Sequence, residues 1–150
     1  MEFKTYDDIL KFAIRREEEA IEAYGEMSEK AQTPGLKHLL LELQDEEKKH
    51  KKLLQNISEE QVASFPKKEV LDLKISDFLT EEPITGDMTF QDLLIFAAKK
   101  EQHAVELYTR LKEDAQNEEL QKIFDFLISQ EKTHKLKLEK EYEKQVLQED

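Results

Sequence analysis

The sequence contains no cysteine. Disulfide bonds, iron–sulfur clusters, a rubredoxin-type iron site and thiol catalysis are therefore excluded for these 150 residues. The sequence also contains only three glycines and three prolines, while Glu, Lys and Leu are its commonest residues. Because those three residue types are good helix formers and few residues interrupt them, we expect long helices.

Long apolar runs are missing too. None approaches the roughly 20 residues that a membrane-spanning helix needs. The first four residues lack the basic and apolar regions of a signal peptide, so we expect a cytoplasmic protein. The formal net charge of −12 would repel nucleic acid and anionic lipid, whereas it raises the local concentration of cations. We therefore expect neither nucleic acid nor a membrane as a partner.

The chain contains an internal repeat. Residues 5–55 align with residues 89–139 without a gap and share 19 identities in 51 positions, which indicates a duplication within one domain spanning 1–150. In each copy, a glutamate precedes a Glu-x-x-His motif by 30 residues. The six residues so defined are Glu17, Glu47, His50, Glu101, Glu131 and His134.

Four long helices are predicted, with ends uncertain by about two to four residues. Capping residues and a first-turn proline mark their beginnings, namely Thr5 with Asp8, Thr33 before Pro34, Thr89 with Asp92, and Asn117. The predicted ranges are 5–31, 34–58, 89–116 and 118–146. Short breaks join the first helix to the second and the third to the fourth, so each pair is expected to form an antiparallel hairpin.

Residues 59–88 connect the two predicted hairpins. A stretch of this length inside a compact domain is unusual unless it has a structural role. It is long enough to cross a bundle lengthwise, and residues 73–79 are a candidate short helix within it. The alternative is a mobile linker.

The six repeated residues are predicted to face a common core. At about 100° per residue, Glu47 and His50 fall in the middle of an apolar stripe, and Glu131 and His134 do the same on the fourth helix. Glu17 and Glu101 are flanked by apolar residues on the first and third helices. Outside these stripes lie four further candidates, which are predicted to face solvent: His38, His103, Glu22 and Glu106.

Four carboxylates that share an apolar core require positive charge, because each ion costs several kcal/mol to remove from water. No Lys or Arg falls within the stripes near this level, and two neutral histidines would not compensate. Two divalent metal ions would, and oxygen and nitrogen ligands suit a pair of ions roughly 3.5–4 Å apart. A buried acid network that shares protons is the alternative. Fe, Mn and Zn all accept such ligands, so the ligand types leave the metal open.

The six residues, in this order along four helices, resemble the ligand set of ferritin-like di-iron carboxylate proteins, and their spacing most resembles that of the rubrerythrins. The resemblance covers essentially the whole chain. It implies an all-α, ferritin-like four-helix bundle of two duplicated hairpins joined by a long crossover, with two iron ions oxidised by peroxide or dioxygen. Rubrerythrins typically carry an additional glutamate where this chain has Ala104, and usually a rubredoxin domain with four cysteines. This chain has neither, so its electrons would come from a separate donor such as a rubredoxin-like protein or a flavoprotein.

Two tyrosines lie near the predicted site. Tyr24 and Tyr108 follow Glu17 and Glu101 by seven residues on the same helix faces, and helical side chains lean toward the N-terminus. We expect each phenol either to donate a hydrogen bond to a ligand carboxylate across the bundle or to fill the core with its hydroxyl satisfied elsewhere.

Three functions fit the sequence. The first is a non-haem di-iron oxidoreductase that reduces hydrogen peroxide or dioxygen, with the six residues as metal ligands and catalytic residues. The second is a ferroxidase or iron-handling protein, and the third is a metal-binding bundle without turnover. Whether two copies pair as a homodimer is left open by the sequence.

Overall fold

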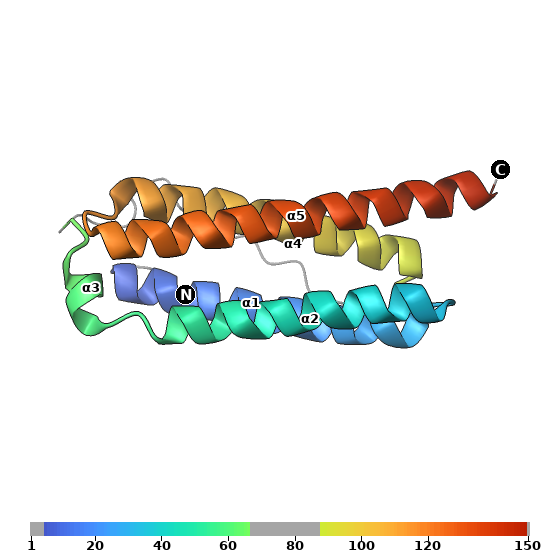
Figure 1. Cartoon of the computed structure of the whole chain (residues 1–150), viewed down its shortest axis with the longest axis horizontal. Coiled ribbons are helices and arrows are strands. Elements are labelled where there is room, and N and C mark those ends of the chain that lie inside the picture. Colours follow the sequence, from blue (N-terminus) through green and yellow to red (C-terminus); the bar gives the residue numbers. More distant parts are fainter. Residues whose placement is uncertain (1–4, 67–87, 150) are drawn as a thin grey trace.

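The computed structural model describes residues 5–66 and 88–149. Within these ranges the secondary structure consists of helices (Figure 1). They are α1 (Tyr6–Lys30), α2 (Pro34–Gln55), α3 (Glu59–Ala63), α4 (Phe90–Asp114) and α5 (Glu118–Glu149). The predicted all-α class and the four long helices are thus confirmed, with ends within a few residues of those expected. The short helix α3 was not predicted.

The long helices pack as a four-helix bundle (Figure 1). α1 and α2 form one antiparallel hairpin and α4 and α5 form the other, with α1 packed against α4 and α2 facing α5. α3 and the beginning of α4 lie at opposite ends of the bundle, as a lengthwise crossover requires. Most of that crossover, including the candidate helix at 73–79, lies outside the described residues.

Side-chain caps start the helices at the predicted positions. Thr5 and Asp8 form reciprocal hydrogen bonds of 3.1 and 3.2 Å between side chain and backbone, and Thr89 and Asp92 repeat this arrangement with two bonds of 3.1 Å. At the start of α5, Oδ1 of Asn117 accepts from the backbone N–H of Leu120 at 3.0 Å. Each cap satisfies a backbone donor that the first turn leaves unpaired and so fixes the register of the helix behind it.

The core consists of two apolar clusters separated by a polar layer about halfway along the bundle axis. One cluster gathers residues from the start of α1, the end of α4 and the first half of α5, including Ile9, Leu111 and Phe124. The other gathers the end of α1 and the starts of α2 and α4, including Met27 and Leu94. The charged residues predicted to face inward occupy the layer between the two clusters.

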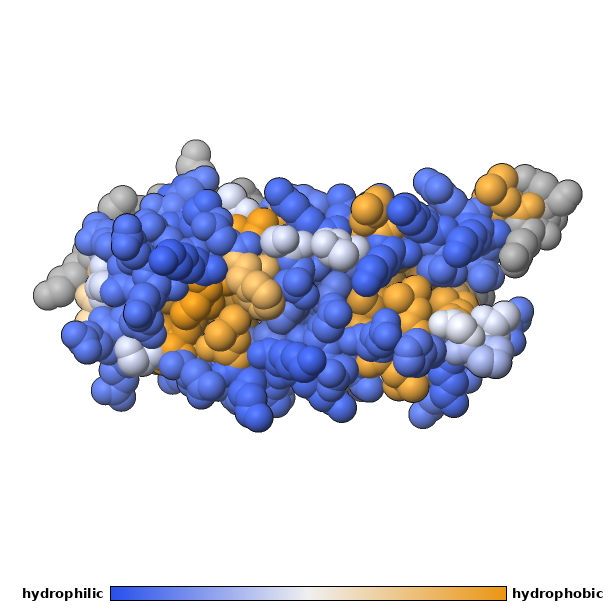
Figure 2. Space-filling model, in the orientation of Figure 1, coloured by the Kyte–Doolittle hydropathy of each residue, from blue (hydrophilic) through white to orange (hydrophobic). Residues whose placement is uncertain are grey.

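The outer surface is mainly hydrophilic. Figure 2 shows the face on which α2 and α5 lie, where apolar areas toward each end are separated by hydrophilic side chains in the middle. No helix within residues 5–66 and 88–149 has the length and apolar character needed to cross a membrane.

Candidate metal centre

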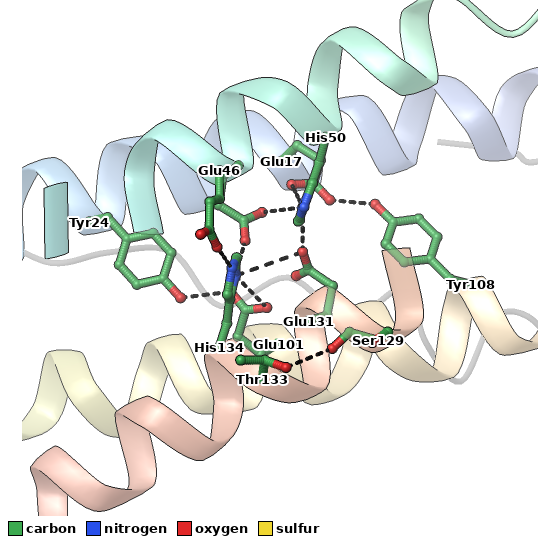
Figure 3. A network of polar contacts seen from close by, with 11 residues as sticks. Glu17, Tyr24, Glu46, His50, Glu101, Tyr108, Ser129, Glu131, Thr133 and His134 are labelled. Carbon is green, nitrogen blue, oxygen red and sulfur yellow. Dashed lines mark hydrogen bonds and ion pairs between the residues drawn. The ribbon is translucent and has the colours of Figure 1, made fainter. Parts of the chain in front are cut away.

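The four long helices bring all six repeated Glu and His side chains into one buried layer (Figure 3). Each helix contributes near its midpoint, because the residues lie inside the apolar stripe that the helix turns toward the core. Every one of the six is at most 2% exposed: Glu17, Glu47, His50, Glu101, Glu131 and His134. The side chains therefore lie together, as the helical periodicity predicted.

The six side chains form two overlapping groups of possible metal donors. The first group is Glu17, Glu47, His50 and Glu131, and the second is Glu47, Glu101, Glu131 and His134. In each group, one donor atom from every residue lies within 4.8 Å of the others. Glu47 and Glu131 belong to both groups, so they occupy the positions from which a carboxylate would bridge two ions.

The histidine contacts cross between the two hairpins. Nδ1 of His50 on α2 lies 2.6 Å from Oε1 of Glu131 on α5. Nδ1 of His134 on α5 lies 2.6 Å from Oε1 of Glu47 on α2. The two imidazole rings are nearly parallel, with centroids 5.6 Å apart and planes inclined by 13°. Each hairpin thus completes the donor group of the other, as a duplicated pair of helices allows.

Several polar atoms in this layer are buried without a hydrogen-bond partner. They include one oxygen of each of the four cluster glutamates and Nδ1 of His50, whose short approach to Glu131 lacks hydrogen-bond geometry. Such atoms cost free energy unless something else binds them. Because carboxylate oxygens and imidazole nitrogens are ligands for divalent iron, manganese and zinc, the unpartnered atoms fit a pair of bound metal ions.

The carboxyl groups show the electrostatic strain of this arrangement. Burial, reinforced by the charges of neighbouring glutamates, raises the pKa of Glu17, Glu101 and Glu131 above the usual 4.5. Burial also acts on Glu47, but its contacts with Glu17 and His134 outweigh that effect and hold its pKa below the usual value. A metal-free cluster therefore retains protons that bound cations would displace.

Comparisons with known proteins agree with this arrangement. Residues 8–142 match the rubrerythrin family. The chain belongs to the rubrerythrin family. A solved structure of a hypothetical protein from Pyrococcus furiosus is 31% identical, with a TM-score of 0.69, and the match covers 89% of this chain and 85% of that one. No curated protein matches the chain. Membership of this family confirms the ferritin-like fold, and together with the buried donor groups it supports a two-metal centre.

Of the two alternatives expected for the tyrosines, the structure shows the hydrogen bond to a cluster carboxylate in both cases. The hydroxyl of Tyr24 on α1 donates to Oε1 of Glu101 on α4 at 2.7 Å. The hydroxyl of Tyr108 on α4 donates to Oε1 of Glu17 on α1 at 2.5 Å. Burial and the adjacent carboxylates raise the pKa of both phenols well above 10, so both remain neutral hydrogen-bond donors.

The four residues predicted to face solvent are exposed to different degrees. Glu22 is exposed, and His38 is 76% exposed and pairs with Glu42 on the same helix. His103 and Glu106 are only partly exposed, so the prediction that they face solvent holds less well for them. None of these residues belongs to either donor group.

Two cationic side chains are also buried in this part of the bundle. Lys100, 9% exposed, donates to Oε2 of Glu19 at 2.5 Å. The guanidinium carbon of Arg16 lies 4.9 Å from the centre of the Phe12 ring. Both of these contacts are made with residues outside the two donor groups.

One residue beside the cluster was not predicted. Glu46 on α2 contacts Nε2 of His134, the ring nitrogen that faces away from the cluster. As the neighbour of Glu47, it lies about 100° from the centre of the apolar stripe, so helical periodicity places it on the flank of α2. Only the packing of α2 opposite α5 shows that its side chain reaches the histidine.

Proposed function

We propose that this protein is a non-haem di-iron oxidoreductase that reduces hydrogen peroxide or dioxygen. The observation that carries the proposal is the pair of donor groups that share Glu47 and Glu131 and contain buried, unpartnered oxygens. Glu17 with His50 and Glu101 with His134 would be the terminal ligands of the two positions. Bound iron ions would supply the electrons that convert one hydrogen peroxide and two protons into two waters.

The protein contributes a dry, preorganised site. The apolar clusters on either side of the polar layer, along the bundle axis, limit the access of water to the donor atoms. Tyr108 holds its hydroxyl proton against Oε1 of Glu17, and Tyr24 does so against Oε1 of Glu101. These bonds fix one oxygen of each terminal carboxylate and leave the other, Oε2, unpartnered.

Electrons for repeated turnover would come from a separate protein. The 150 residues contain no cysteine, so they lack the thiolate ligands of a rubredoxin-type iron site. A rubredoxin-like protein or a flavoprotein is the class of donor we propose. Iron is also part of the proposal. The donor set alone would suit manganese and zinc as well.

Stopped-flow absorbance after anaerobic loading tests this function. Protein loaded with two Fe(II) per chain is mixed with hydrogen peroxide or with dioxygen. We expect rapid oxidation that ends after one equivalent of peroxide per pair of ions. Consumption of excess Fe(II) together with dioxygen would support a ferroxidase instead, and the absence of oxidation would support a metal-binding bundle without turnover.

A matched pair of double variants controls this experiment. Glu47→Gln with Glu131→Gln removes the two shared donors and should abolish the reaction. Glu22→Gln with Glu106→Gln removes the same formal charge from two repeat-related glutamates outside the donor groups, and should leave the reaction unchanged.

A further inference from the structure

The two copies of the repeat differ at one residue directly beside the cluster. The two copies carry identical donor residues at an offset of 84 positions, but Glu46, which precedes the shared Glu47, corresponds to Gln130, which precedes the shared Glu131. One copy therefore offers a negatively charged side chain where the other offers a neutral amide.

Glu46 acts on only one of the two histidines. The His134 ring contacts Glu46 through Nε2 (Figure 3) and Glu47 through Nδ1, the latter at 2.6 Å. The ring itself is 0% exposed, whereas the Glu46 side chain is 36% exposed. Because this side chain is only partly removed from water, a negative charge on Glu46 costs less desolvation than one on the fully buried cluster glutamates. When Nε2–H donates to Glu46, the lone pair of Nδ1 is directed at the cluster.

His50 lacks the matching interaction. Its contacts with the carboxylates of Glu17, Glu47 and Glu131 are all made through Nδ1. Phe126 lies against the ring edge-on, with centroids 6.1 Å apart and planes at 86°. Within residues 5–66 and 88–149, no carboxylate contact is made by Nε2 of His50. The two imidazoles are thus alike toward the cluster and different on the far side.

We propose that Glu46 is a positioning residue that makes the two metal positions unequal. A carboxylate on the distal nitrogen fixes the orientation of a ligating imidazole and strengthens it as a donor, and loss of such a partner typically lowers metal affinity about 10–100-fold. The position formed with His134 and Glu101 therefore binds a divalent cation more tightly than the position formed with His50 and Glu17. This inference rests on the proposed metal binding, but not on peroxide reduction.

Anaerobic titration of the metal-free protein with Co(II) tests the proposal, with calorimetry and visible absorption as readouts. We expect the wild-type protein to bind two Co(II) ions in two resolved steps that differ about 10–100-fold in affinity. His134→Ala should remove the tighter step, and His50→Ala the weaker one. Glu46→Gln should weaken the tighter step by about that factor, so that the two steps converge.

Two further variants separate a specific contact from general charge. Glu42→Gln removes a glutamate one turn earlier on α2, where it pairs with the exposed His38, and should leave both steps unchanged. Gln130→Glu introduces the missing carboxylate in the second copy and should strengthen the weaker step. The visible bands of the first bound Co(II) should shift in Glu46→Gln but not in Glu42→Gln, which an effect on folding alone would not produce.

The outcomes distinguish this inference from the proposed function. Two bound ions whose affinities are unchanged in both Glu46→Gln and Gln130→Glu would overturn the role of Glu46 while leaving the two-metal centre intact. Binding of no Co(II) by the wild-type protein would overturn both. If Glu46→Gln lowers the melting temperature of the metal-free protein, the result for Gln130→Glu decides, since that variant retains Glu46.

Discussion

Tyr108 on α4 donates a 2.5 Å hydrogen bond to Oε1 of Glu17 on α1. The repeat-related bond, from Tyr24 to Glu101, runs in the opposite direction between the same two helices at 2.7 Å. Two hydrogen bonds of opposite direction therefore join α1 to α4, one on each side of the cluster (Figure 3). They link the two hairpins through carboxylates that are candidate metal ligands, so the packing of the bundle and the geometry of the site depend on each other.

Replacing either tyrosine with phenylalanine should destabilise the protein. Tyr108→Phe leaves a buried carboxyl oxygen without its donor, which typically costs about 1–3 kcal/mol. For a domain of this size, each kcal/mol lowers the melting temperature by roughly 2–4 °C. Tyr142→Phe, which removes a hydroxyl from a partly buried tyrosine at the core edge, is the control and should change little. Equal melting temperatures for Tyr108→Phe and the wild type would show that the bond contributes nothing.

The metal-free protein should lose stability as the pH rises. The pKa values of Glu17, Glu101 and Glu131 are raised in the folded state, mainly by burial. Contacts with Glu101 and Glu47 overcome the effect of burial on His134 and raise its pKa to about 10. Groups with a raised folded-state pKa bind more protons in the folded than in the unfolded chain. Their contribution to the stability of the folded state therefore declines as the pH rises from the unfolded-state pKa to the folded-state pKa.

This pH window lies above 4.5 for the three glutamates and between 6.5 and about 10 for His134. Glu47 acts in the opposite sense, but only at pH values below its ordinary 4.5. We therefore expect the melting temperature of the metal-free protein to fall from pH 5 to pH 9, measured in the presence of a chelator. The stabilisation by added metal should grow over the same range, because binding displaces protons. A melting temperature that rises steadily with pH would contradict the assignment.

The fold could be predicted because local signals and helical periodicity agree. Thr5, Thr89 and Asn117 cap their helices where expected, since capping depends on residues within a single turn. On α2, all the buried residues lie on the predicted stripe around Glu47, although Leu36 at its start is only partly buried. Helix α3 was missed because five residues are too few for periodicity to show, although Ser58 and Gln61 form a capping box there.

For the candidate site, the periodicity of each helix predicts which side chains point toward the core. The inward direction of Glu47 and His50 follows from their own helix, and the repeat extends it to Glu131 and His134. Contacts between helices do not follow in this way. The reach of Glu46 to His134 depends on the distance and rotation of α2 relative to α5, which the periodicity of either helix leaves undetermined.

Ala104→Glu tests the difference between this chain and typical rubrerythrins. Ala104 lies one turn beyond Glu101 and packs against the apolar cluster that contains Tyr108. If an additional carboxylate here assists peroxide reduction, the variant should oxidise loaded Fe(II) with hydrogen peroxide faster than the wild type in stopped-flow measurements. Ala20→Glu, the repeat-related change beside Glu17, is the control for general electrostatics. An equal gain in both variants would contradict a role specific to position 104.

The shared and terminal glutamates should differ in their effect on metal content. Glu47 and Glu131 belong to both donor groups, so Glu47→Ala and Glu131→Ala should each weaken the binding of both ions. Glu17→Ala and Glu101→Ala should each weaken mainly one. Competition with a chelator of known affinity, followed by metal analysis, measures the difference. If all four variants lose metal equally, neither Glu47 nor Glu131 acts as a bridge between two positions.

Metal analysis of the wild-type protein is the most direct test of the two-metal centre. After anaerobic loading with excess Fe(II) and removal of unbound metal, we expect about two ions per chain, because four buried carboxylates balance the charge of two divalent cations. His38→Ala, which alters an exposed histidine outside both donor groups, should retain the same content. A content near zero in the wild-type protein would contradict the account.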